Sequence, residues 1–260
     1  YDIFRSFSEP DKPRYAPHVQ YAELVMNHEH MGIYGISDRV DADMLHFPDS
    51  SLDGTNRPVL YKSVGGHANF DHVSSEDYIQ KVPDWKTGPY WGPYETLMNF
   101  LGQADKKTFQ ERVEHIIDVE NIIDFEILLL VTNNMEGRNA NLYIARAQGL
   151  DARFFLVPWD YDMTYRMNQM PSNHLIRRLQ QDLPGYTLRL KSRWEELRKH
   201  RLSEATVMKR IDDMEDILRE GVARNFERWP IEPGQTHETE VQAMKDWLKS
   251  RLVQLDRRMA

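Results

Sequence analysis

The sequence predicts an α+β protein of two lobes, with strands in its first part and helices in its second. In the first ninety or so residues, short runs of β-branched and aromatic residues alternate with clusters of Gly, Asn, Asp and Pro, which is typical of strands and turns. After this stretch, apolar residues recur three and four positions apart, as on one face of a helix. We therefore expect a strand-rich lobe at residues 1–93 and a mainly helical lobe at residues 94–260.

The sequence of the amino-terminal part predicts a β-hairpin and, farther along, a strand that carries Lys62. Val19, Tyr21 and Leu24 favour a strand, and a polar turn at 27–29 separates it from a second apolar run, which predicts a hairpin. Farther along, Lys62 lies in a strand that ends at two glycines. The predicted elements are strands at 18–27, 32–36 and 59–64, a short helix at 40–47, and a long loop at 66–93 with a short helix at 76–80.

The carboxy-terminal part predicts helices around one central hairpin. Ser203 is a typical residue for the start of a helix, because its hydroxyl can accept a hydrogen bond from the first turn. The predicted helices are 94–103, 106–118, 120–133, 173–182, 186–200, 203–229 and 238–258. Two short strands, 141–146 and 153–158, lie between the third and fourth helices and predict the hairpin.

Oxygen-bearing side chains gather at the ends of this hairpin. Carboxylate and carboxamide oxygens are the ligands that Mg²⁺ and Ca²⁺ prefer. A loop acid, an Asn five residues later and an acid at the end of the far strand form the layout that phosphoryl-transfer enzymes use to orient a hydroxyl and hold a metal ion. The side chains are Asn134, Glu136, Asn139, Asn141, Asp160 and Asp162.

The two aspartates after the second strand are the first candidates for a metal site. Residues two apart in a strand point to the same side, so Asp160 and Asp162 are expected to face one ligand, with Asp160 the main metal ligand and Asp162 a secondary one. Asn141 is the third expected metal ligand. The alternatives are that the aspartates cap a turn and that Asn141 is an ordinary strand-edge residue. Asn134 and Asn139 are expected to shape the loop.

These segments resemble a known family. Asn134-Met135-Glu136, then Asn141-Leu142-Tyr143, and the Pro-Trp-Asp-Tyr-Asp run at 158–162 are similar to the N-x-D…N-x-Y…P-W-D-x-D signature of the CotH kinase family. That family comprises spore-coat and secreted or surface proteins with an atypical protein-kinase fold of two lobes. Residues 24–40, 60–62, 118–125 and 247–255 also resemble family segments, so the similarity covers most of the chain.

The resemblance implies roles for three more side chains. Lys62 would bind the phosphates of ATP, because an ammonium on a flexible stem suits phosphate. Asp38 stands where the family has Glu, and would pair with Lys62 or Arg39 beside the nucleotide. Glu136 would be the catalytic residue that orients the hydroxyl, with ATP and Mg²⁺ or Mn²⁺ as cofactors.

Glu136 also marks a departure from the family, whose loop acid is Asp. The extra methylene moves the carboxylate by roughly a bond length, and a displacement of about 1 Å can cost on the order of a hundredfold in rate. The resemblance therefore supports two functions. One is a kinase that transfers the γ-phosphate of ATP to Ser or Thr of a protein. The other is a catalytically weakened, pseudokinase-like surface or structural binding protein of the same fold. For either function, the resemblance implies a protein of the spore coat or a secreted or cell-surface protein.

A more distant alternative is a carbohydrate-processing protein that uses two acids and aromatic platforms, although no acid pair can be assigned at the separation this chemistry needs. The cluster of Trp85, Tyr90, Trp91 and Tyr94 is accordingly expected to pack at the junction of the lobes rather than to bind a sugar or base.

The composition of the chain argues against several classes of partner and site. The net charge of −8 argues against a nucleic-acid partner, because binding a polyanion needs a basic surface. No apolar run approaches 18 residues, so no membrane span is expected. The absence of cysteine excludes disulfides and thiolate metal sites. Since Tyr1 is not an initiator Met and the family's first strands have no counterpart upstream of it, we expect a fragment whose amino-terminal lobe is incomplete. The oligomeric state is not indicated.

Overall fold

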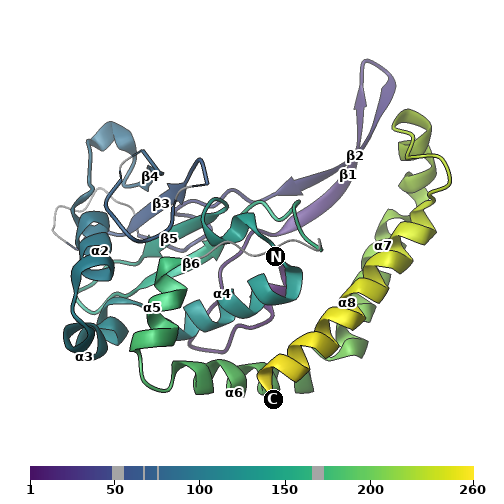
Figure 1. Ribbon diagram of the computed structural model, residues 1–260. Helices are drawn as coiled ribbons and strands as arrows, with labels where there is room; N and C mark the ends of the chain where they lie inside the picture. Colours follow the sequence, from purple (N-terminus) through teal and green to yellow (C-terminus); the bar gives the residue numbers. More distant parts are fainter. Residues whose placement is uncertain (49–55, 67, 75, 166–172) are drawn as a thin grey trace.

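The computed structural model describes residues 1–48, 56–66, 68–74, 76–165 and 173–260 and shows a mixed α+β protein (Figure 1). An antiparallel pair, β1 (Val19–Met26) and β2 (Glu29–Ser37), lies apart from a four-stranded sheet of order β4-β3-β5-β6. Its strands are β3 (Val59–Ser63), β4 (Tyr78–Val82), β5 (Leu142–Arg146) and β6 (Phe154–Pro158). The helices are α1 (Asp2–Arg5), α2 (Gly92–Gln103), α3 (Lys106–Ile116), α4 (Val119–Thr132), α5 (His174–Asp182), α6 (Tyr186–Lys199), α7 (Glu204–Arg228) and α8 (His237–Met259), with short 3₁₀ turns η1 (Trp85–Thr87) and η2 (Glu136–Arg138).

Two of the predicted elements are wrong. Residues 40–47 form turns instead of a helix, and His46 takes a left-handed φ of 53° that an α-helix cannot continue through. The helix expected at 76–80 is replaced by β4, in which Tyr78, Gln80 and Val82 are buried while Ile79 is exposed. Pairing with β3 satisfies the backbone of this segment, and the local pattern did not reveal that distant partner. The other predicted strands and helices are confirmed within a few residues.

The four-stranded sheet is antiparallel and separates two apolar clusters. Tyr61, Ile144 and Leu156 face the larger cluster, whereas Leu60, Tyr143 and Val157 face the smaller one, as the two-residue period of strands requires. α4 lies against the larger cluster, and all its residues from 121 to 132 are buried. The sheet joins strands from both sides of residue 93, and the division into lobes at that residue stays a prediction.

Packing explains most of the predicted aromatic cluster. Trp91 stacks on Tyr61 with ring centroids 5.3 Å apart and meets the ring of Tyr94 at 5.6 Å. Trp85 differs, since 71% of its surface is exposed.

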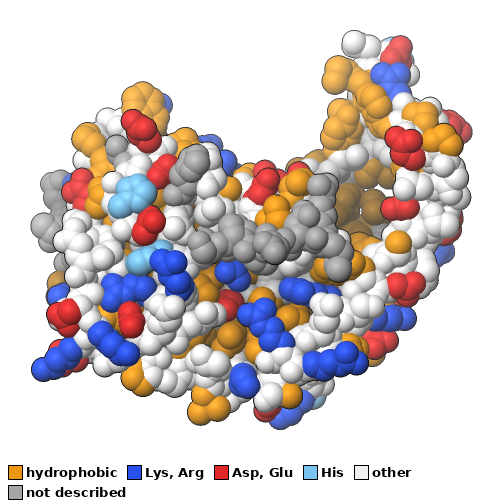
Figure 2. Space-filling model, viewed as in Figure 1, with side chains coloured by type: hydrophobic (Ala, Val, Ile, Leu, Met, Phe, Trp, Pro, Cys, Tyr) orange, Lys and Arg blue, Asp and Glu red, His pale blue; other side chains and the backbone are white. Residues whose placement is uncertain are grey.

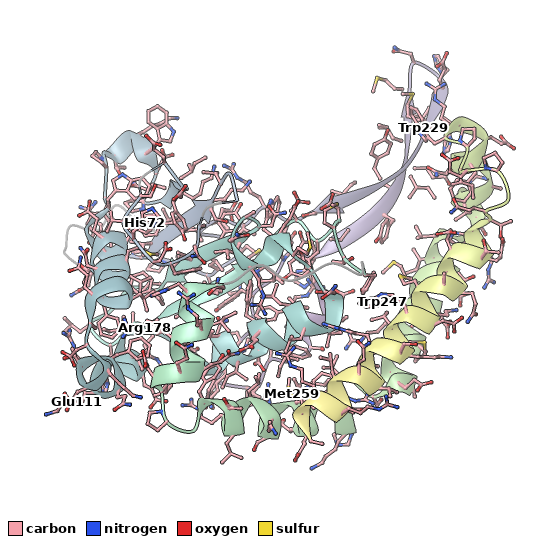
Figure 3. All side chains as sticks on the ribbon, viewed as in Figure 1. His72, Glu111, Arg178, Trp229, Trp247 and Met259 are labelled. Atoms are coloured by element: carbon pink, nitrogen blue, oxygen red, sulfur yellow. The ribbon has the colours of Figure 1, made fainter. Side chains whose placement is uncertain are left out.

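The long helices α7 and α8 form an arm that supports the β1–β2 hairpin. The Ser203 hydroxyl accepts a hydrogen bond from the Thr206 amide at 3.2 Å, so the predicted start of α7 is confirmed. At the far end of this helix, the indole of Trp229 donates to the carbonyl of Met31 in β2 (Figure 3). Figure 2 shows a hollow between this arm and the body of the molecule. Within the described residues, no helix is long and apolar enough to cross a membrane.

A buried acid on α4 ties the amino terminus to the helical core. The Asp124 carboxylate is fully buried and accepts hydrogen bonds from Arg14 Nε at 2.6 Å and Arg193 Nε at 2.8 Å. Arg14 precedes β1 and Arg193 lies in α6, so one carboxylate connects three segments. Buried charges are tolerated when each is paired and hydrogen-bonded.

The first prediction concerns this pairing. Asp124→Ala should lower the free energy of unfolding by about 3–5 kcal/mol, because it leaves the Arg14 guanidinium buried without its partner. Urea denaturation followed by circular dichroism measures the change. The matched control is Asp213→Ala, which removes an exposed carboxylate paired with Lys209 and should cost less than about 1 kcal/mol. Equal effects of the two substitutions would contradict the structural role of Asp124.

Candidate active site

The loop between α4 and β5 is shaped by its own asparagines. α4 is capped by Asn133, whose left-handed φ of 49° is a conformation that Asn tolerates. The Asn134 side-chain oxygen then accepts a hydrogen bond from the Gly137 amide at 3.0 Å, as predicted for a loop-shaping residue. The Glu136 carbonyl accepts from the amides of Ala140 and Asn141 at 2.8 and 2.9 Å. The loop is therefore wound tightly around Glu136, and its side chain is held at the start of η2.

Asn141 connects the loop before β5 with the segment that follows β6. Its amide Nδ2 donates to Glu136 Oε2 at 2.8 Å and lies 3.2 Å from the backbone carbonyl of Asp160. Three of the predicted site residues therefore lie together, although they come from the loop, the start of β5 and the segment after β6. Asn141 Oδ1, the atom that would bind a metal ion, makes no hydrogen bond to any described residue.

The two aspartates do not face a ligand by strand alternation, and that part of the expectation is wrong. β6 ends at Pro158, and Asp160 takes a left-handed φ of 54°, so the two-residue period no longer applies. Both Asp160 and Asp162 are exposed. In the part of the chain that the structure describes, neither carboxylate is in an ion pair, which leaves both available to a cation.

The Asp160 backbone is held by a residue that the sequence did not single out. Its amide donates to the hydroxyl of Tyr1 at 2.9 Å, and the Tyr1 ring lies 6.1 Å from that of Tyr161. Burial raises the pKa of the Tyr1 phenol, and the negative charges of Asp160 and Asp162 raise it further, although the Asp160 amide lowers it. Because Tyr1 and Asp160 are 159 positions apart in the sequence, no local pattern predicts their contact.

Lys62 lies near this site on the adjoining strand. It is half-buried and pairs across strands with Tyr143, the second residue of β5. Its Nζ lies 5.4 Å from the centroid of the Trp159 ring. The Trp159 ring in turn packs edge-to-face against the ring of Tyr143, with ring centroids 5.9 Å apart. A cation over an aromatic face is attracted by the ring. The Lys62 ammonium is thus held over the residue that precedes Asp160.

Asp38 does not make the expected pair. Its carboxylate accepts from the His18 amide and contacts His18 Nδ1, both at 3.0 Å. The amide hydrogen bond, followed by the imidazole, lowers the pKa of Asp38. The structure records no ion pair from Asp38 to Lys62 or Arg39, all three of which it describes. Asp38 instead pairs with His18 at the open end of the β1–β2 hairpin, one position beyond Val19 and Ser37. Binding of a cofactor by Asp38 stays a prediction.

The donor set fits a hard divalent cation. Asn141, Asp160 and Asp162 supply oxygen atoms at one end of the hairpin, and the oxygen of Asn141 and both carboxylates lack partners in the described structure. Such oxygens suit Mg²⁺ or Mn²⁺, which keep several water ligands. Among the described residues, no group of three or more His, Cys, Asp or Glu side chains is placed to hold a metal ion. Two carboxylates and one carboxamide would therefore have to be completed by phosphate oxygens and water.

The fold and this site define a mixed α+β protein with a site suited to metal and phosphate. The model of the CotH kinase protein family matches residues 1–255, and the chain belongs to this family. Membership implies a kinase-like fold. A search of curated proteins found no match to the chain.

The second prediction tests the packing under Glu136. A Cβ on Gly137 would lie 2.7 Å from Leu129 Cδ2, 3.2 Å from the Tyr161 hydroxyl and 3.4 Å from Asn134 Cγ. Gly137→Ala should therefore cost about 1–3 kcal/mol of unfolding free energy, as overpacking of a buried site does. Gly92→Ala is the control, because a Cβ there meets nothing within 4 Å and its first-turn position favours Ala. Thermal unfolding compares the variants, and equal stability would show that the loop yields to the extra carbon.

Proposed function

We propose that this chain is a protein kinase that transfers the γ-phosphate of ATP to a Ser or Thr hydroxyl of a protein, with Mg²⁺ or Mn²⁺. The observation that carries the proposal is the side chain of Asn141, which brings Glu136 and Asp160 to one place. Membership of the CotH kinase family supports it. The family's association with the spore coat favours a place in the spore coat or on another outer surface.

Each side chain has a task in this proposal. Asn141 Oδ1, Asp160 and Asp162 would hold the metal ion, which when bound offsets the negative charge of the phosphates. Lys62 would attract the phosphates from the neighbouring strand, and the face of Trp159 keeps its ammonium in place. The metal-binding side chains and Lys62 would both act by position and charge, which supply most of the catalysis in phosphoryl transfer.

Glu136 would orient the acceptor hydroxyl. Its Oε2 is occupied by Asn141, whereas Oε1 has no hydrogen bond to a described residue. Oε1 would accept the hydroxyl proton while the hydroxyl oxygen bonds to the γ-phosphorus and the bond from that phosphorus to the bridging oxygen breaks. The hydrogen bond from Asn141 fixes the carboxylate in one orientation, which offsets part of the freedom that the longer Glu side chain adds.

A second function is a binding protein of the same fold with weak or no transfer. Two features favour it: the Glu at the place of the family's Asp, and the bond of that carboxylate to Asn141. In this case Asn141, Asp160 and Lys62 would still bind metal and nucleotide.

The third prediction tests metal-dependent nucleotide binding. ATP with Mg²⁺ should raise the thermal unfolding temperature of the wild type, since a ligand that binds only the folded state stabilises it. Asp160→Asn should lose most of this shift, because the amide removes a negative charge from the metal site. Asp151→Asn, an exposed acid in the turn of the same hairpin, is the matched control and should keep the shift. If the wild type shows no shift with either Mg²⁺ or Mn²⁺, the nucleotide-binding proposal fails.

The fourth prediction separates the two functions at Glu136. In the kinase, Glu136→Gln should lower transfer from radiolabelled ATP by about a hundredfold or more and leave ATP affinity unchanged, because a general base is lost. In the binding protein, the wild type should be inactive and Glu136→Asp should gain transfer. Autophosphorylation and transfer to a generic protein acceptor, with Mg²⁺ and with Mn²⁺, provide the assay. Equal activity of an active wild type and Glu136→Gln would move the catalytic role to another residue.

A further inference from the structure

A cavity lies at the other end of β5 from Asn141. It is about 650 Å³ in volume, within the range of ligand sites, and opens between the starts of α2 and β6 and the last turns of α3. Its basic lining residues are Arg57, Arg112, His115 and Arg146, which come from three separate segments. No Asp or Glu is among its described lining residues. The described lining of the cavity is therefore basic, whereas the chain as a whole carries a net charge of −8.

The guanidinium groups around the cavity lie on aromatic rings. The Cζ atom of Arg146 is 5.1 Å from the centre of the Phe154 ring, that of Arg112 is 5.9 Å from Phe100, and that of Arg57 is 5.9 Å from Tyr90. A ring at such a distance attracts the cation, and the N–H groups of the guanidinium remain able to donate. The rings beside Arg112 and Arg146 therefore favour the position of these two cations without neutralising them.

Arg112 and Arg146 have no carboxylate partner within the described structure. Arg14 and Arg193, by contrast, are both paired with the Asp124 carboxylate. Arg146 Nε is also buried without a hydrogen-bond acceptor, which is costly for a donor of this kind. Burial lowers the pKa of Arg146, and an anion in the cavity would offset that loss of hydration. The geometry and charge both call for an anionic ligand.

The shape of the lining indicates which anion. A guanidinium matches the oxygens of a phosphate monoester with two parallel hydrogen bonds, and arginine clusters are the usual way in which proteins recognise phosphorylated side chains. Beside the basic residues, the cavity is lined by Leu97, Ile116 and Leu150, the last of which is 88% exposed. An inorganic phosphate would not use these apolar groups, but the residues that flank a phosphorylated side chain would.

We propose that this cavity binds a phosphorylated Ser or Thr in a segment of a protein partner, with Arg112 and Arg146 on the phosphate and Leu150 beside a flanking apolar side chain. The choice of a phosphorylated protein rests on the proposed function, because such a protein is its product. Arg146 lies five positions after Asn141, or roughly 16 Å farther along the strand. A partner held here by one phosphorylated residue would have room to place another hydroxyl at the candidate active site.

The fifth prediction tests the cavity by direct binding. A fluorescein-labelled peptide with phosphoserine next to leucine should bind the wild-type chain, measured by fluorescence polarisation without ATP or metal. Its unphosphorylated form should bind at least about tenfold more weakly, since the charged hydrogen bonds are lost. Arg112→Gln should weaken binding by about tenfold or more, and Arg112 is exposed on α3, so the fold should be kept. Arg146→Lys keeps the charge but removes the fork, and should also weaken binding.

The control is Lys107→Gln, which makes the same change of charge on the same helix at an exposed position outside the cavity. It should leave binding unchanged, with thermal unfolding confirming the fold of every variant. Equal effects of Arg112→Gln and Lys107→Gln would overturn the proposal. Equal binding of the two peptides would also overturn it. The same holds if ATP, at the concentration at which it binds the chain, displaces the phosphopeptide, or if inorganic phosphate binds as tightly as the peptide. Because no nucleotide is present, failure here would leave the proposed phosphotransfer untouched.

Discussion

The hydrogen bonds of one amide group hold the candidate active site together. Asn141 Nδ2 contacts the Glu136 carboxylate and the Asp160 carbonyl, so the loop after α4 and the segment after β6 are fixed relative to each other. Glu136 lies in the short 3₁₀ turn η2 and Asp160 lies beyond the end of β6, so neither is positioned by a long helix or a strand. The same contact leaves Asn141 Oδ1 as an acceptor, so a single side chain both builds the site and offers a ligand in it.

Hydrogen bonds between β3 and β5 fix the strand that carries Lys62 relative to the strand that follows Asn141. Ser63, the residue after Lys62, donates to the Leu142 carbonyl at 2.9 Å and accepts from the Leu142 amide at 3.2 Å. The strand that carries Lys62 is thereby fixed to the first residue of β5, directly after Asn141. Trp247 of α8 (Figure 3) packs edge-on against the ring of Tyr165, with ring centroids 5.4 Å apart. Phosphoryl transfer depends on position and fixed charge, and rigid neighbours of this kind are what it requires.

The β5–β6 hairpin has opposite electrostatic character at its two ends. Asp160 and Asp162 at one end are exposed acids without partners among the described residues, whereas Arg146 at the other end opens onto a cavity lined with arginine. An acidic end suits a cation and its phosphates, and a basic end suits a phosphate without a metal ion. Two phosphate-directed sites of opposite charge can therefore be held on one short element without competing for the same ligand.

Local patterns in the sequence determined the helices α2 to α8, the two hairpins, the Ser203 cap and the loop-shaping role of Asn134, because each depends on residues a few positions apart. The motif residues also indicated that Glu136, Asn141 and Asp160 belong together. Only the tertiary structure decided the contacts between distant segments. It placed Tyr1 on Asp160, His18 on Asp38 and β4 beside β3, and it turned Asp160 into a left-handed conformation beyond the end of its strand. These contacts depend on how the chain folds back on itself, and neither periodicity nor composition carries that information.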